Sequence, residues 1–134
     1  MAKLEDVEGI GKTYANKLKK AGVASTNDLL EQGATAVGRV ALAEKSGISQ
    51  SLILEWVNRV DLFRIKGVGE EYSDLLEASG VDTVVELSKR KAANLLQKMV
   101  EVNEAKHKVR RLPLESQVQD WIEQAKKLPR VIKY

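Results

Sequence analysis

Apolar residues recur along the chain at spacings of three and four positions, in short runs that end at glycines. Between residues 12 and 21, Tyr14, Leu18 and Ala21 have the i, i+4, i+7 spacing of one helix face. Gly22 follows at the position where a left-handed residue ends a helix. We find no sustained two-residue alternation, so no sheet is expected. The pattern predicts an all-α protein made of short helices.

Polar caps and glycines divide this pattern into separate helices. Ser25 or Thr26 is a candidate N-cap, and Gly33 is expected to stop the helix that follows it. Gly47 ends another helix, and Ser49 is the expected N-cap of the next. The predicted helices span residues 12–21, 27–32, 35–45 and 50–60 in the first half of the chain, and residues 70–79, 84–90, 92–109 and 114–127 in the second.

The chain contains an internal repeat, which is a sign of modular architecture. Residues 7–23 align without gaps on residues 65–81, and the matched pairs are Gly9/Gly67, Gly11/Gly69, Tyr14/Tyr72, Leu18/Leu76 and Gly22/Gly80. Residues 51–57 match residues 116–122 at a longer spacing. This second match pairs the two tryptophans of the chain, Trp56 and Trp121, which we expect to be buried.

The change of spacing between the two matches places about seven extra residues in the second copy, between residues 94 and 112. Pro113 takes the place of Ile48 and is a natural start for the last helix. Two matches in the same order predict a tandem duplication. We therefore expect a first unit at residues 1–61 and a second at residues 62–134.

Both copies follow one pattern, apolar-x-x-apolar-x-Gly-apolar-Gly-x-x-x-small, closed by a further apolar residue. The first copy fills it with Leu4, Val7, Gly9, Ile10, Gly11, Ala15 and Leu18, and the second with Leu62, Ile65, Gly67, Val68, Gly69, Ser73 and Leu76. This pattern resembles the helix-hairpin-helix motif. The whole chain resembles an uncharacterised family of small bacterial and archaeal proteins built from tandem repeats of that motif.

The spacing of the motif has a physical reason. The apolar residue between the glycines plugs into the core between two helices and holds the loop rigid. Glycine permits backbone angles that are forbidden to residues with a Cβ, so the loop presents bare N–H groups at the start of the next helix, where the helix dipole favours an anion. In proteins with this motif the anion is a nucleic-acid phosphate, and loop carbonyls sometimes hold a monovalent cation. Such contacts carry no sequence information.

Transferred to this chain, the resemblance implies phosphate-binding residues in both hairpins: Gly9, Ile10, Gly11, Lys12, Thr13, Lys66, Gly67, Val68 and Gly69. The supporting basic residues are Lys17, Lys20, Lys89, Arg90 and Lys91. The first hairpin is the better candidate, because Glu70 and Glu71 replace Lys12 and Thr13 in the second and would repel a phosphate. Since loop charges are swapped between the copies, the alternative is that the hairpins face each other or a protein partner.

Charge is distributed unevenly over the 134 residues, whose net charge is +3. Through Asp61 there are eight Lys and Arg against eight Asp and Glu, and from Leu62 onward there are fourteen against eleven. The excess lies in residues 89–91, 106–111 and 126–133. The chain has no cysteine, no signal-peptide pattern at its start and no apolar run near the roughly 20 residues that span a bilayer. We expect a cytoplasmic protein without a membrane segment.

Candidate catalytic chemistry is missing from the pattern. The single histidine, His107, follows Glu104 at the Glu-x-x-His spacing found in di-iron helix bundles. A di-iron site needs a second Glu-x-x-His pair, which the chain does not contain. Gly11-Lys12-Thr13 resembles the end of a nucleotide-binding loop, but Asp6 stands where that loop needs glycine. We therefore expect a non-enzymatic protein with no cofactor beyond a monovalent cation at a hairpin. The first hypothesis is sequence-independent binding of duplex DNA, and the alternative is a protein-interaction or assembly module, with the oligomeric state left open.

Overall fold

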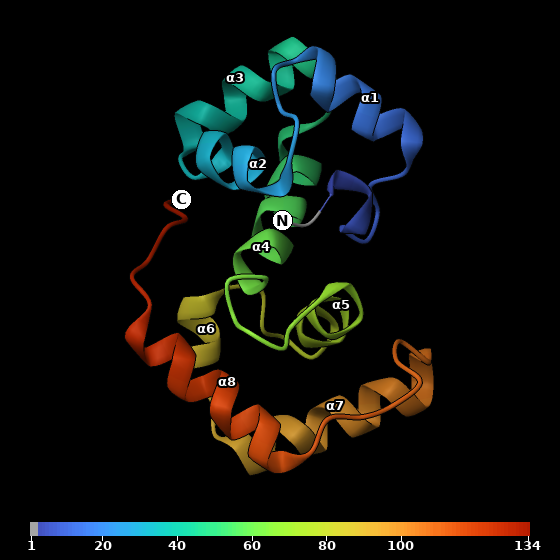
Figure 1. Cartoon of the computed structure of the whole chain (residues 1–134), viewed down its shortest axis with the longest axis vertical. Coiled ribbons are helices and arrows are strands. Elements are labelled where there is room, and N and C mark those ends of the chain that lie inside the picture. Colours follow the sequence, from blue (N-terminus) through green and yellow to red (C-terminus); the bar gives the residue numbers. More distant parts are fainter. Residues whose placement is uncertain (1–2) are drawn as a thin grey trace. The chain divides into compact units, whose positions relative to one another are not determined.

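The computed structural model describes residues 3–134 of the chain (Figure 1). Over this range it contains eight α-helices, one short 3-10 turn and no strand, which confirms the all-α prediction. The helices form two compact units. Residues Leu62–Arg130 form the second unit, and the residues up to Asp61 form the first together with Val131–Tyr134. The last four residues, which we expected in the second unit, thus belong to the first.

The first unit is a series of short helices with polar caps. Its elements are η1 (Leu4–Asp6), α1 (Lys12–Lys20), α2 (Thr26–Gly33), α3 (Ala36–Ser46) and α4 (Gln50–Leu62). The hydroxyls of Ser25, Thr35 and Ser49 accept the backbone N–H three residues ahead at 3.2, 3.1 and 3.3 Å. Each such cap stabilises its helix by about 1 kcal/mol. The predicted caps at Ser25 and Ser49 are confirmed.

Buried apolar side chains of the first unit come from every one of its elements. They are Leu4, Val7, Ile10, Ala15, Leu18, Val23, Leu29, Leu42, Ile48, Ile53, Trp56, Val57 and Val60. Gly33 ends α2 as predicted, but it is a buried residue of the last helical turn rather than a left-handed stop. A Cβ at Gly33 would lie 2.5 Å from Cγ2 of Val57, so close packing requires the glycine.

The last four residues complete the first unit as an extended segment. The Lys133 N–H donates to the Ala34 carbonyl (2.7 Å), and Ile132 is buried. Arg39 donates from Nη1 to the Gly33 carbonyl (2.8 Å) and from Nη2 to the Lys133 carbonyl (3.0 Å). Arg39 belongs to α3 and is only 6% exposed, and its guanidinium binds the last carbonyl of α2, where the helix dipole is negative. The buried guanidinium of Arg39 therefore connects the last residues of the chain to the end of α2 through hydrogen bonds.

The second unit contains α5 (Glu70–Ala78), α6 (Val84–Ser88), α7 (Ala92–Lys106) and α8 (Glu115–Lys127). One cluster of buried side chains forms its core: Leu62, Ile65, Val68, Leu75, Leu76, Val81, Val84, Leu87, Ala92, Leu95, Met99, Val109, Val118, Trp121, Ile122 and Ala125. The Thr83 hydroxyl caps α6 by accepting the Glu86 N–H at 3.3 Å. Figure 1 shows α8 lying alongside α6 and α7, whose apolar faces it helps to cover.

Helix α7 is shorter than the predicted span of residues 92–109. It ends at Lys106, because His107 adopts a left-handed conformation with φ 50° and ψ 49°. The Asn103 side chain then binds both backbone groups of Val109: its Oδ1 accepts the N–H at 2.9 Å and its Nδ2 donates to the carbonyl at 3.2 Å. The Asn103 side chain thus occupies backbone groups of Val109 that a longer helix would use for its own hydrogen bonds. The spacing of apolar residues in the sequence does not indicate this contact.

The two units share local backbone geometry at the positions that match in sequence. Gly9 and Gly67 have φ 94° and 96°, and Gly22 and Gly80 have φ 95° and 93°. Hydrogen bonds at matching positions have nearly equal lengths. In the hairpins, the Ile10 N–H donates to the Val7 carbonyl at 3.0 Å, and the Val68 N–H donates to the Ile65 carbonyl at 3.1 Å. Four further bonds are 2.9 Å long and form two matching pairs: Ala15 N–H to Gly11 O with Ser73 N–H to Gly69 O, and Val23 N–H to Leu18 O with Val81 N–H to Leu76 O.

The units differ farther along the chain. Helix α3 has 11 residues, whereas α7 has 15. The connection at residues 47–49 in the first unit corresponds to residues 107–114 in the second. The second unit is therefore longer than the first both in α7, compared with α3, and in the connection that follows it. No helix in the described range 3–134 is long and apolar enough to cross a membrane.

Candidate nucleic-acid interface

The first Gly-Ile-Gly hairpin is a turn held by its own backbone. The Val7 carbonyl accepts the Ile10 N–H at 3.0 Å, and the Ile10 side chain is 3% exposed. Ile10 is thus the apolar plug that the motif predicts, and its N–H is already bonded. Gly9 has φ 94°, and a Cβ there would lie 3.1 Å from Nε1 of Trp56. Glycine is therefore required at position 9 both by backbone conformation and by the indole packed against it.

An aromatic pair supports this hairpin from the protein side. The ring of Trp56 packs edge-on against the ring of Tyr14, with centroids 5.0 Å apart and planes at 62°. This is a favourable aromatic geometry. Trp56 lies on α4 and Tyr14 on α1, so the contact joins the helix that follows the hairpin to the last helix of the unit. The sequence pattern paired the two tryptophans of the repeat but did not reveal that each one lies against a hairpin glycine.

Helix α1 begins directly after this rigid turn. Its N-cap is Gly11, which has no side chain that could accept a hydrogen bond. The first backbone hydrogen bond of the helix is donated by the Ala15 N–H to the Gly11 carbonyl at 2.9 Å. The N–H groups of Lys12, Thr13 and Tyr14 precede that bond and have no acceptor within the helix. Lys12 and Thr13 are exposed. The positive end of the α1 dipole is therefore open to a ligand.

Charge on α1 has one sign. The helix contains Lys12, Lys17, Lys19 and Lys20 and no carboxylate, and all four side chains are exposed. Nζ of Lys17 lies 5.8 Å above the ring of Tyr14, which is within cation–π range. Glu8, exposed in the hairpin loop, is the acidic residue closest in sequence. The first hairpin and α1 together form a basic surface next to an open helix N-terminus.

The second hairpin has the same turn but a different outer face. The Ile65 carbonyl accepts the Val68 N–H at 3.1 Å, Val68 is buried, and Gly69 is the N-cap of α5. A Cβ at Gly67 would lie 3.0 Å from Nε1 of Trp121. The ring of Trp121 packs on that of Tyr72, with centroids 5.2 Å apart. The support of the loop is therefore the same in both units.

A glutamine and two glutamates lie at the second hairpin. Gln124 binds Lys66 through both backbone groups: its Oε1 accepts the N–H at 2.9 Å and its Nε2 donates to the carbonyl at 3.1 Å. The N-terminus of α5 carries Glu70 and Glu71, both exposed. Their carboxylates already supply the negative charge that the helix dipole favours. Gln124 was not found from the sequence, since no motif marks it; its only signal is its place three residues after Trp121.

The supporting basic residues divide between the two units. Lys17 and Lys20 lie on α1, next to the first hairpin in sequence, whereas Lys89 and Lys91 are exposed in the connection from α6 to α7. Arg90 is engaged inside its own unit: Nε contacts Oε1 of Glu86 at 3.3 Å and Nη2 donates to the Gly80 carbonyl at 2.9 Å. Its position matches that of Gln32, which binds the Gly22 carbonyl at 3.1 Å. Arg90 thus holds a turn in place.

Side chains that could ligate a metal ion are not clustered among residues 3–134. No group of three or more His, Cys, Asp or Glu side chains lies together in a way that could hold a metal ion in that part of the chain. His107 and Glu104 are both exposed. The first hairpin and α1 offer exposed lysines beside backbone N–H groups that have no acceptor within the helix.

Comparison with known proteins identifies one family. Residues 8–128 match the model of a family described as a domain of unknown function (DUF4332). Neither the curated proteins nor the solved structures gave a significant match to the chain.

Proposed function

The chain belongs to the DUF4332 family of domains of unknown function, and we propose that it is a non-enzymatic module that binds the phosphate backbone of duplex DNA without sequence preference. One observation carries the proposal. The first hairpin ends in a helix N-terminus that no side chain caps, on a helix with four lysines and no carboxylate. A duplex phosphate supplies the acceptors and the negative charge that this surface lacks.

The first hairpin would bind a phosphate mainly through its backbone. The N–H groups of Lys12, Thr13 and Tyr14 have no acceptor within α1, and the helix dipole favours an anion at this end. Lys12 and Lys17 add charge from exposed positions, and the Thr13 hydroxyl adds a donor. Contacts of this kind are made to phosphate oxygens and not to base edges, so they fix position on the duplex without reading its sequence.

We also propose that both units are helix-hairpin-helix repeats related by tandem duplication. The support is local: equal φ angles at Gly9 and Gly67, matching hydrogen bonds in both hairpins, and a tryptophan against each hairpin glycine. The same resemblance suggests a monovalent cation at the first hairpin. The Val7 and Gly11 carbonyls each accept one N–H and keep a second lone pair for such an ion. We propose no other cofactor, and a cytoplasmic location.

The experiment is a fluorescence-anisotropy titration of two labelled duplexes of unrelated sequence at several salt concentrations. We expect equal affinity for both duplexes and a plot of log K against log salt that falls with a slope of about −0.9 for each phosphate contacted. Lys12→Glu should weaken binding at every salt concentration. The matched control is Lys45→Glu, an exposed lysine on α3 of the same unit with the same change in charge. Equal weakening by both variants would show that net charge alone, and not the hairpin, binds the duplex.

A second candidate function is a protein-interaction or assembly module. The observation that favours it is the second hairpin, which Gln124 closes and Glu70 and Glu71 make acidic. Such a surface complements the basic face of α1. This function predicts a stable oligomer in sedimentation velocity and no duplex binding at low salt, whereas the first predicts binding by a monomer.

A further inference from the structure

The last residue of α7 and the connection that follows it contain a run of basic residues that lies outside both hairpins. We name residues 106–111, Lys-His-Lys-Val-Arg-Arg, the basic loop; they contain no carboxylate. The corresponding connection of the first unit, Gly47-Ile48-Ser49, carries no charge at all. The first unit joins the corresponding helices with three uncharged residues, so the length and the charge of this connection are specific to the second unit.

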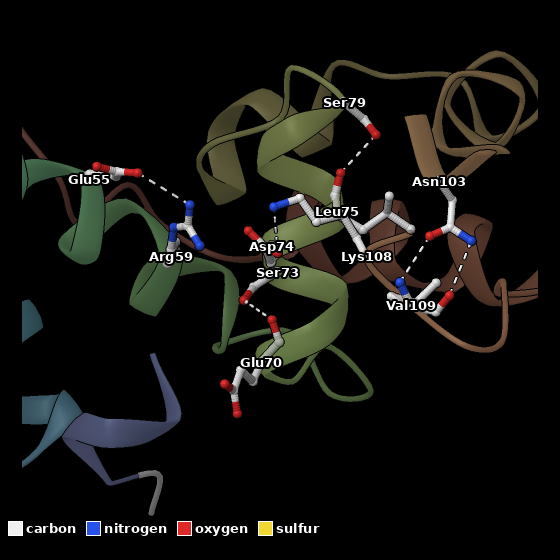
Figure 2. A network of polar contacts seen from close by, with 10 residues as sticks. All are labelled: Glu55, Arg59, Glu70, Ser73, Asp74, Leu75, Ser79, Asn103, Lys108 and Val109. Atoms are coloured by element: carbon white, nitrogen blue, oxygen red, sulfur yellow. Dashed lines mark hydrogen bonds and ion pairs between the residues drawn. The ribbon is translucent and has the colours of Figure 1, made fainter. Parts of the chain in front are cut away.

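The basic loop begins with an unusual backbone conformation. Among residues 3–134, His107 is the one residue other than glycine with a positive φ, at 50°. Its counterpart in the first unit is a glycine, Gly47, with φ 73°. A non-glycine residue in this region costs free energy and persists where its surroundings hold it. Here the holding group is Asn103, which binds both backbone groups of Val109 at 2.9 and 3.2 Å (Figure 2).

Two further contacts anchor the loop to α5. Nζ of Lys108 lies 3.1 Å from Oδ2 of Asp74, whose side chain is 9% exposed, and Figure 2 shows this pair pointing toward each other. The Tyr72 hydroxyl donates to the Arg111 carbonyl at 3.0 Å. The Lys108 charge is thus neutralised inside the unit, and the backbone is fixed near both ends of the loop.

The side chains left to face solvent are all basic. Lys106, His107, Arg110 and Arg111 are exposed, and none of them forms an ion pair within the described residues 3–134. Arginine presents a planar fork of donors that matches phosphate oxygens. A loop held in place before binding loses less conformational entropy when a ligand arrives.

We infer that the basic loop is a second contact for the nucleic-acid phosphate backbone, located in the second unit and distinct from the first hairpin. The inference rests on the proposed function for the identity of its ligand. Glu70 and Glu71 place negative charge at the second hairpin, whereas the basic loop offers exposed cations in the same unit. Arg110 and Arg111 make the contacts, and Asn103 is a positioning residue that holds the loop without touching the ligand.

The test is the same duplex titration, carried out with Arg110→Gln/Arg111→Gln. The double variant should reduce the magnitude of the salt slope by about two, since two phosphate contacts are lost. The charge-matched control is Lys98→Gln/Lys127→Gln, two exposed lysines of α7 and α8 outside the loop, which should leave the slope nearly unchanged. An unchanged slope in the loop variant, or an equal loss in the control, overturns the inference.

A second variant tests the positioning role without removing charge. Asn103→Leu deletes both hydrogen bonds to Val109, so we expect roughly three- to tenfold weaker binding with the salt slope kept. Circular dichroism at the assay temperature checks that the helices are retained. Full affinity in a folded Asn103→Leu protein would contradict the claim that loop order contributes to binding.

The outcomes separate this inference from the proposed function. If Lys12→Glu weakens duplex binding and the loop variant does not, the hairpin proposal stands and the loop inference fails. If the loop variant loses binding and Lys12→Glu does not, the hairpin proposal fails and the loop is a binding surface on its own. Absence of wild-type binding at any salt concentration contradicts both. Binding of poly-glutamate that depends on the loop, with no effect on duplex, would replace DNA by an acidic protein as partner.

Discussion

Gly9 is the position at which the geometry of the first hairpin is best tested, because a substitution there would be opposed both by the backbone conformation and by a steric contact. At φ 94° an alanine is strained, and its Cβ would lie 3.1 Å from Nε1 of Trp56, a ring held by its own packing. The conformational penalty is about 1–2 kcal/mol. The steric contact adds about 1–2 kcal/mol, as overpacking in a core does. Gly9→Ala should therefore lower the free energy of unfolding by about 2–4 kcal/mol.

Two other glycines of the same unit separate these contributions. Gly22 has φ 95° but open space around its Cβ position, so Gly22→Ala carries only the conformational penalty, about 1 kcal/mol after the entropy gain in the unfolded chain. Gly11 has φ −90° and also has open space, so Gly11→Ala should change stability by less than about 0.5 kcal/mol. The expected order of destabilisation is position 9, then 22, then 11.

Urea denaturation followed by tryptophan fluorescence measures the effect in the relevant unit. Each unit contains one tryptophan, so a Trp121→Phe background leaves Trp56 as the reporter of the first unit. Circular dichroism gives the loss of helix in the same samples. If Gly9→Ala costs no more than Gly22→Ala, the contact between the indole and the hairpin is not a constraint. If Gly11→Ala costs as much as Gly9→Ala, the geometry assigned to the turn is wrong.

Three further predictions follow from individual contacts. Arg39→Met removes two hydrogen bonds to carbonyls and should cost about 2–3 kcal/mol in urea denaturation, with faster amide exchange at the chain end. Gln124→Ala removes both bonds to Lys66 and should cost about 1–2 kcal/mol without raising duplex affinity in anisotropy, since the two glutamates remain. Glu70→Lys/Glu71→Thr combined with Gln124→Ala removes both the acidic side chains and the glutamine from the second hairpin, and should increase the magnitude of the salt slope by about one.

Local rules explain most of what could be predicted from the sequence. The helix boundaries near Lys12 and Gly47 and the caps at Ser25 and Ser49 follow from glycines, hydroxyls and apolar spacing within a few residues. The buried hairpin residue Ile10 follows from the motif. These features depend on neighbours along the chain, which a single sequence displays directly.

Contacts between distant residues account for what could not be predicted. Arg39 is buried because its acceptors include a carbonyl at Lys133, far along the chain, and no local signal marks it. The early end of α7 depends on an asparagine that folds back on Val109. In the second hairpin, the closing partner of Lys66 is a glutamine on α8. Periodicity identifies which face of a helix is apolar, but it does not say which polar side chain crosses to another element.

Binding of DNA phosphate at the N-terminus of α1 can be measured by comparing three proteins. A labelled duplex is titrated with wild type, Lys12→Glu and Lys45→Glu over a range of salt concentrations. We expect salt-sensitive binding by wild type, weaker binding by Lys12→Glu with a slope smaller in magnitude by about one, and binding by Lys45→Glu close to that of wild type. No binding by wild type at low salt, or identical slopes for wild type and Lys12→Glu, would contradict this expectation.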